Sequence, residues 1–147
     1  MARLVLTNVE VTIGGVDLSN HIASVSLGST YDVVETTAFA GITGAAGNVP
    51  QAAKTRTAGL VDNSVTFEFH QDFAASSVEA TIYPLLGTTV PVVVQPVAAG
   101  AVSADNPSYS FQAVISEWTP LNGAVGELAT ASVTWPITGA IVQDVTP

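Results

Sequence analysis

The stretch SVTFEFHQDFAASSVEATIYPLLGTTVPVVVQP, residues 64–96, decides the fold, because it predicts a strand, a helix and a second strand in succession. In its first part, residues 64–70, Val65, Phe67 and Phe69 alternate with polar residues. A period of two places these three side chains on one face of a strand and the polar residues on the other. This segment is therefore predicted to be a strand with one buried face.

A short helix is predicted soon after this strand. Ser76 followed by Glu79 has the spacing of a capping box, in which two side chains satisfy the first free N–H groups of a helix. Pro84 should end or tighten the last turn, because it cannot donate a backbone hydrogen bond, and Gly87 suits the exit. Four apolar residues fall on one side of this helix at helical spacing: Val78, Ile82, Leu85 and Leu86.

Turn residues separate further alternating segments along the chain. Gly14-Gly15 predicts a two-residue hairpin turn after residues 9–13, because both glycines tolerate positive φ. Residues 88–94 are predicted to be a strand that is either buried on both faces or at an edge, and Pro91 favours the edge position because it lacks a donor N–H. Further strands are predicted at residues 16–18, 22–27, 31–35, 110–119 and 127–135, with a short one near Ile141.

One long segment, residues 36–60, follows neither the strand nor the helix period. It is rich in Gly, Ala and Thr, and it holds two of the three basic residues, Lys54 and Arg56. Long irregular segments in a compact domain are usually functional or disordered. We therefore predict a long loop here.

These elements predict a mainly β protein. Seven or eight strands, one helix and one long loop indicate a β-sandwich or open barrel with a single flanking α-helix. The 147 residues show no linker or internal repeat, so we expect one domain over residues 1–147.

Charge is unusually scarce and one-sided. Only 10% of residues are charged, against about 25% in an ordinary soluble domain, and acids outnumber bases by 12 to 3. Scarce charge is typical of surfaces that other subunits cover, although a solitary Thr/Ala/Val-rich β domain has the same composition. Tight nucleic-acid binding requires a basic patch, which this chain lacks. No segment reaches the roughly 20 apolar residues of a membrane helix, and the start lacks a signal-peptide core.

Motifs for catalysis are absent from the sequence. It has no cysteine and no nucleophile elbow, phosphate-binding loop or HExxH motif. His70 and Asp72 could form an acid–base pair, but nothing singles out a nucleophile, so we interpret His70 as a polar strand-end residue. His21 is interpreted as a solvated turn histidine. We expect a protein that is not an enzyme and needs no cofactor.

Two kinds of binding site are disfavoured by the sequence. Asp17, Asp32 and Glu35 could meet around calcium, but no loop has the spacing that preorganises oxygen ligands. Trp118 and Trp135 could stack on a sugar, although tryptophans on paired strands are more often core or interface anchors. We expect no metal site.

The order of the segments resembles the tail tube, or major tail, proteins of siphophages that infect actinobacteria. The resemblance lies in VEVTIGGVDLSNHIASVSL, then YDVVETTAF, a Gly-rich loop, FEFHQDFAASSVEATIYPLLGT, the SADNPSY turn and two closing alternating strands. It spans most of the chain. The segment after Thr37-Ala38 is longer and less charged than is usual in that family.

This resemblance implies a virion protein, made in the host cytoplasm, whose hexameric rings stack into a tail tube that conducts DNA. It also implies self-association through sheets that join between subunits, and contacts with tape-measure, terminator and distal tail proteins. Glu68 and Glu117 are candidate lumen acids, while Lys54 and Arg56 are candidate inter-subunit contacts on the long loop. A tail terminator or head–tail joining protein, and a carbohydrate-binding or adhesion β-sandwich, remain alternatives.

Overall fold

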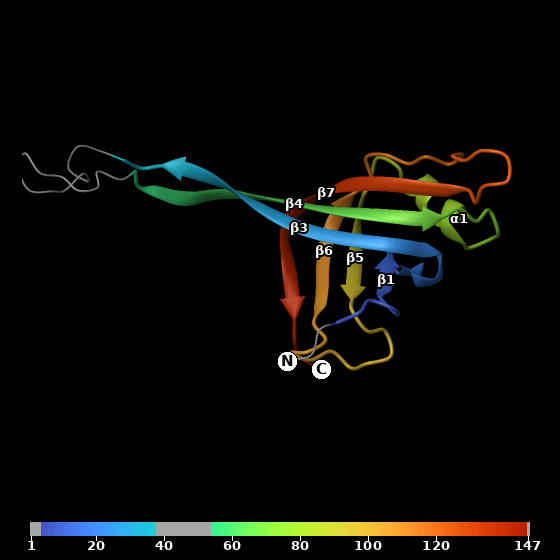
Figure 1. Ribbon diagram of the computed structural model, residues 1–147, viewed down its shortest axis with the longest axis horizontal. Coiled ribbons are helices and arrows are strands. Elements are labelled where there is room, and N and C mark those ends of the chain that lie inside the picture. Colours follow the sequence, from blue (N-terminus) through green and yellow to red (C-terminus); the bar gives the residue numbers. More distant parts are fainter. Residues whose placement is uncertain (1–3, 38–53, 147) are drawn as a thin grey trace, which may run out of the picture. The chain divides into compact units, whose positions relative to one another are not determined.

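The computed structural model describes residues 4–37 and 54–146, and it confirms the mainly β fold with one short α-helix (Figure 1). Seven strands form one sheet in the order β2-β1-β5-β6-β7-β4-β3. The strands are β1 (Glu10–Ile13), β2 (Val16–Asp17), β3 (Ile22–Glu35), β4 (Arg56–His70), β5 (Thr89–Gln95), β6 (Ser108–Val114) and β7 (Thr130–Asp144).

The chain divides into two compact units, each with its own character. The sheet body consists of residues 1–28 and 63–147, and the ribbon consists of residues 29–62. Strands β3 and β4 each run from the sheet body into the ribbon.

The predicted turn at Gly14-Gly15 is confirmed. Both glycines have positive φ, 59° and 86°, and the turn pairs Ile13 with Val16 in an antiparallel β1–β2 hairpin. A 3-10 turn, η1 (Ser19–His21), then leads into β3. The turn is tied back to β1, because the hydroxyl of Ser19 accepts a hydrogen bond from the N–H of Val11 at 2.9 Å.

Strand β7 joins the two halves of the body by changing partners. Its first half pairs with β4, from His70↔Thr130 to Asn63↔Ile137, and its second half pairs with β6 as far as Ser108↔Asp144. Figure 1 shows β7 bending sharply between these halves. Gly139, with a φ of +83°, lies at the change of partner, and the buried amide of Asn63 donates to its carbonyl at 3.0 Å. Sheets that pack across each other are often connected by such a bent strand.

The core lies inside this bent sheet. Val65, Phe67 and Phe69 are all fully buried, which confirms the predicted inward face of β4. The indole of Trp135 packs edge-on against Phe67, with ring centroids 5.7 Å apart. The remaining fully or nearly fully buried apolar side chains come from β1, α1, β5, β6 and β7 and the segments between them: Val11, Ile13, Leu18, Val78, Ile82, Val90, Val92, Val94, Phe111, Ala113, Ile115, Ala131, Val133 and Ile137.

The helix is present, but its predicted capping box is wrong. Helix α1 (Val78–Ile82) follows Ser77, which makes no capping hydrogen bond through its side chain, while Ser76 has a φ of +60°. The carboxylate of Glu79 instead accepts bonds from other side chains of the body. Pro84 tightens the exit into a 3-10 turn, η3 (Tyr83–Leu85), as predicted.

The predicted apolar stripe of this helix is correct only over its first turns. Val78 and Ile82 are fully buried, and Leu85 packs partly against the core. Leu86 is 43% exposed, because the chain has already left the helix there. Gly87, with a φ of +87°, makes the exit turn as predicted.

The prediction that Pro91 marks an edge strand is wrong, because β5 lies between β1 and β6. The carbonyl of Pro91 accepts the N–H of Gly14 at 2.9 Å, so it points from β5 toward the β1 side. The imide nitrogen of Pro91 points toward the β1 side as well, because the N–H and C=O of one residue in an antiparallel strand face the same neighbour. Strand β1 ends at Ile13, one residue earlier. The missing N–H of Pro91 therefore faces a turn rather than a paired strand.

Several predicted element boundaries are also corrected. The two strands expected at residues 22–27 and 31–35 are one strand, β3, and β4 begins at Arg56 inside the predicted loop. Strand β6 ends at Val114 rather than Thr119, because the chain there leaves the ladder to bind the edge of β7. The short strand expected near Ile141 is the end of β7. Residues 38–53 of the predicted loop lie outside the described residues.

Candidate interaction surfaces

The ribbon is a pair of strand segments without a core of its own. None of its described residues is buried. The carbonyl of Thr55 accepts the N–H of Thr36 at 2.8 Å, and the side chain of Val34 comes within 3.0 Å of the position where a Cβ on Gly59 would lie. Large apolar side chains are nevertheless exposed along it: Tyr31 58%, Val33 67%, Val34 48%, Leu60 81% and Val61 37%.

A ribbon of this kind is poorly stable in water by itself, because two strands without a packed face are marginal. Its apolar side chains form an exposed apolar patch of the kind that marks a protein interaction site. The ribbon is therefore the clearest candidate interaction surface of the described chain.

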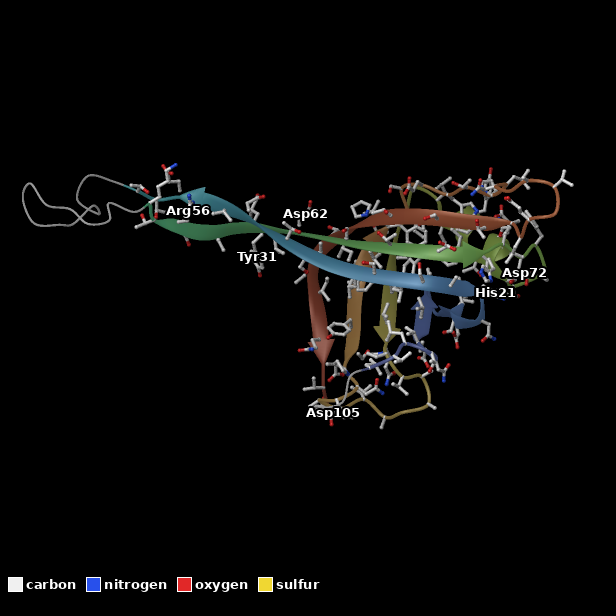
Figure 2. All side chains as sticks on the ribbon, viewed as in Figure 1. His21, Tyr31, Arg56, Asp62, Asp72 and Asp105 are labelled. Carbon is white, nitrogen blue, oxygen red and sulfur yellow. The ribbon has the colours of Figure 1, made fainter. Side chains whose placement is uncertain are left out.

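Both described basic residues belong to this ribbon. Lys54 and Arg56 are exposed, and Figure 2 shows Arg56 on the ribbon together with Tyr31. The ammonium of Lys54 lies 3.5 Å from a carboxylate oxygen of Glu35 in the same chain. Arg56 has no ion-pair partner among residues 4–37 and 54–146. Of the two candidate contact residues, Arg56 is thus the one whose charge is not matched within the described chain.

The two candidate lumen acids have different environments. Glu68 is exposed on the outer, polar face of β4, where it pairs with Ser132 of β7. Glu117 is also exposed, but its carboxylate accepts the N–H of Thr134 at 2.7 Å. Its carbonyl accepts the indole N–H of Trp135 at 2.9 Å. Glu117 therefore satisfies a backbone N–H at the edge of β7. The carboxylate of Glu68, in contrast, accepts no hydrogen bond from the described residues.

The two tryptophans are anchored inside the molecule. Trp135 is fully buried, and Trp118 is half-buried with its ring 5.3 Å from that of Phe69, centroid to centroid. The indole N–H of Trp118 donates to Glu79 at 2.7 Å. Both indole N–H groups are thus used within the chain, which agrees with the interpretation as anchors.

Glu79 is the centre of a network that sequence reasoning missed. One of its carboxylate oxygens accepts bonds from Trp118 and from the amide of Gln71, the latter at 3.0 Å. The same amide donates to the carbonyl of Pro120 at 2.8 Å. The residue types gave no signal for this arrangement, since Glu79 fits a capping box equally well.

We expect Glu79→Gln to lower the free energy of unfolding by about 1 kcal/mol, because hydrogen bonds to a charged acceptor become bonds to a neutral one. Urea denaturation of the two proteins measures this difference. Glu127→Gln is the matched control, since Glu127 is exposed and accepts only one long bond of 3.3 Å. Equal stability of all three proteins would contradict the role given to Glu79.

His21 lies in the turn η1, as expected, with 32% of its side chain exposed, and it also contacts side chains near α1. Its Nε2 lies 3.3 Å from the hydroxyl of Ser77 and 3.6 Å from a carboxylate oxygen of Asp72, and Figure 2 shows His21 beside Asp72. Both contacts fall on one nitrogen, whereas a catalytic triad requires the hydroxyl and the carboxylate on opposite nitrogens. Asp72 thus lies with His21 rather than His70, in an arrangement that joins η1 to the start of α1.

Local hydrogen bonds lower the pKa of three aspartates in the body, Asp17, Asp72 and Asp144, the last through the N–H and then the hydroxyl of Thr146. The hydroxyl and then the N–H of Ser19 hold the pKa of Asp17 below its usual range. The N–H of Ala74, then the hydroxyl of Ser77, do the same for the pKa of Asp72, and the nearby His21 adds a smaller effect.

These shifts predict a loss of stability in acid. A carboxyl group whose pKa is lower in the folded chain stabilises the fold fully above its ordinary value of 3.8, and this contribution disappears as the pH falls through the lower, folded pKa. Thermal melts between pH 7 and pH 2 should therefore show stability falling below about pH 4. Asp17→Asn should reduce this dependence, and an unchanged acid dependence would contradict the assignment.

Among residues 4–37 and 54–146, no group of three or more His, Asp or Glu side chains lies close enough together to hold a metal ion. Asp17 is bound to Ser19, and Asp32 and Glu35 lie in the ribbon. Within the same described ranges, no helix has the length and apolar character needed to cross a membrane.

Comparison of the sequence with protein-family models and with characterised proteins finds no match to a family or a relative.

Proposed function

We propose that this protein is the structural subunit of a bacteriophage tail tube, which assembles into stacked hexameric rings whose acidic lumen conducts DNA. The observation that carries the proposal is the ribbon, which exposes apolar side chains and has no buried residue among those that the structure describes, 29–37 and 54–62. Such a segment requires a covering surface, and a second copy of the chain supplies one in a homo-oligomer. The segment order that resembles tail tube proteins supports the same function.

Charge also favours a second copy as the partner of the ribbon. The chain has a net charge of −9, and both of its described cations lie on the ribbon. A basic group on the ribbon is attracted by the acidic surface of a neighbouring copy. Arg56, which has no ion pair among the described residues, is the stronger of the two contacts in this proposal.

The edge strand of the sheet body supports the joining of sheets between copies. Strand β3 is last in the strand order, and its residues 22–28 contain neither a charge nor a proline. Isolated proteins usually protect such edges with lysine, proline or a bulge. Strand β2, at the other edge, is only two residues long. An unprotected edge is expected where another copy extends the sheet.

An acidic lumen would repel the DNA backbone and let it pass without binding. In this proposal Glu68 is the better lumen candidate, because its carboxylate is exposed on a polar strand face. Glu117 is the weaker candidate, because its carboxylate already binds Thr134. The tube would be part of the virion and would contact tape-measure, terminator and distal tail proteins at its ends.

The role of the ribbon is tested by neutralising its cations. Lys54→Gln combined with Arg56→Gln should strongly reduce the fraction of protein in large assemblies, measured by light scattering after size-exclusion chromatography. The matched control is Ala80→Glu with Gln112→Glu, which changes the net charge equally at exposed positions of the sheet body. Assembly that is unchanged in the first variant, or equally reduced in the control, would contradict a specific role for the ribbon.

A further inference from the structure

The sheet body carries two exposed apolar surfaces outside the ribbon. The first, the loop surface, lies on the connection from β6 to β7. It consists of Leu121 at 79% exposed, Val125 at 104% and Leu128 at 63%. The second, the terminal surface, lies on the first and last described segments and the start of the β5–β6 connection. It consists of Leu4 at 57% exposed, Val5 at 76%, Leu6 at 55%, Val97 at 36%, Val142 at 58% and Val145 at 41%.

These surfaces lie at opposite ends of the body. The carbonyl of Asn8 accepts the N–H of Ala98, and Ser108 pairs with Asp144, so the first and last segments meet at the start of β6. The loop surface follows the other end of β6. Figure 1 shows the end of β7 below the sheet and the β6–β7 connection beyond its opposite side.

The loop surface is held in place rather than merely exposed. The side chain of Gln71 binds the carbonyl of Pro120, and its N–H donates to the carbonyl of Ala129, so one residue fixes both ends of the loop. Within the loop, the carboxylate of Glu127 accepts the N–H of Ala124. A loop that is already ordered loses little entropy on binding.

The loop also contains an open hollow. Its volume is about 290 Å³, and it is lined by Leu121, Asn122, Gly123, Ala124, Glu127 and Ala129. The only acid in the lining is Glu127, whose carboxylate is already bound to Ala124.

Charge restricts what can occupy this surface. Residues 118–126 and residues 4–9 contain no charged side chain. In a chain of net charge −9, these two uncharged segments can meet without placing acid against acid, although Glu127 directly follows the first segment and Asp144 lies between Val142 and Val145 of the terminal surface. Nucleic acid and anionic membranes are disfavoured as partners, because both are bound through basic groups.

We propose that the loop surface of one copy binds the terminal surface of the next, with the residues at Leu4–Leu6 packing against the loop around Val125. Two different surfaces on one chain make a heterologous contact, which continues from copy to copy instead of closing as a two-fold dimer. The proposal rests on the proposed self-assembly and names the surfaces that carry one of its contacts.

Cysteine cross-linking tests the contact, because the chain has no native cysteine. Val5→Cys and Val125→Cys proteins are purified separately, mixed and oxidised. The 5–125 disulfide should predominate, while 5–5 and 125–125 disulfides should stay at the level of a urea-denatured control. A chain with both substitutions should form a ladder of covalent oligomers. Gln112→Cys, exposed on β6 between the two ends, replaces Val125→Cys in the matched control and should abolish the product with Val5→Cys.

The outcomes separate this contact from the proposed function. Tubes that form without a 5–125 disulfide would overturn the contact and leave the tail tube proposal standing. Cross-linked chains that never form tubes would support the contact and contradict the tail tube. A 125–125 disulfide as the main product would overturn the contact, since it indicates a two-fold association.

Discussion

Replacing Trp135 with alanine is expected to lower the free energy of unfolding by about 3–5 kcal/mol, the usual cost of removing a buried aromatic side chain. Trp135 is fully buried, and its ring centroid lies 5.7 Å from that of Phe67 and 6.1 Å from that of Phe69. Its indole N–H also holds the carbonyl of Glu117. The substitution therefore leaves a cavity and releases the segment that follows β6.

Trp135→Phe separates these two effects. It keeps most of the aromatic packing and removes only the hydrogen bond, so we expect a loss of about 1–2 kcal/mol. Urea denaturation followed by far-UV circular dichroism measures all three proteins. A loss below about 1 kcal/mol for Trp135→Ala would mean that this residue is not a core anchor.

Gly139→Val is expected to destabilise the protein by about 3 kcal/mol, because a β-branched residue is strained at the φ of +83° that Gly139 adopts. Open space surrounds the position where a Cβ would lie, so the cost comes from the backbone and not from a clash. The bend of β7 depends on this conformation, as does the bond from Asn63 to the Gly139 carbonyl.

Gly139→Asn is the matched variant, since asparagine tolerates positive φ far better than valine does. We expect it to cost less than about 1 kcal/mol in the same denaturation measurement. Similar losses for valine and asparagine would show that positive φ at Gly139 is not what the bend requires.

Strands with one buried face were predictable from the sequence, and strands without one were not. Phe67 and Phe69 alternate with polar residues because only one side of β4 packs on the core. The same strand begins at Arg56, but its first residues are exposed on both faces and leave no period to detect. The first part of β4 was therefore predicted as part of a loop, whereas residues 31–35 on the other side of the ribbon were predicted as a strand.

Other features depend on contacts between distant segments, which local patterns do not encode. Pro91 indicated an edge strand, yet β5 is an inner strand of the sheet. The N–H that Pro91 lacks would face β1, but β1 ends at Ile13, just before the position opposite Pro91. Glu79 suggested a helix cap, but its carboxylate reaches Trp118, which is 39 positions away in the sequence. The contact of His21 with Asp72 and Ser77 likewise arises only from the fold.

Negative-stain electron microscopy of the purified protein tests the central claim, self-assembly into a tube, most directly. The account predicts hollow tubes of uniform width built from stacked rings, with images of separate rings showing six-fold symmetry. A protein that stays monomeric at high concentration, with its ribbon uncovered, would contradict the account.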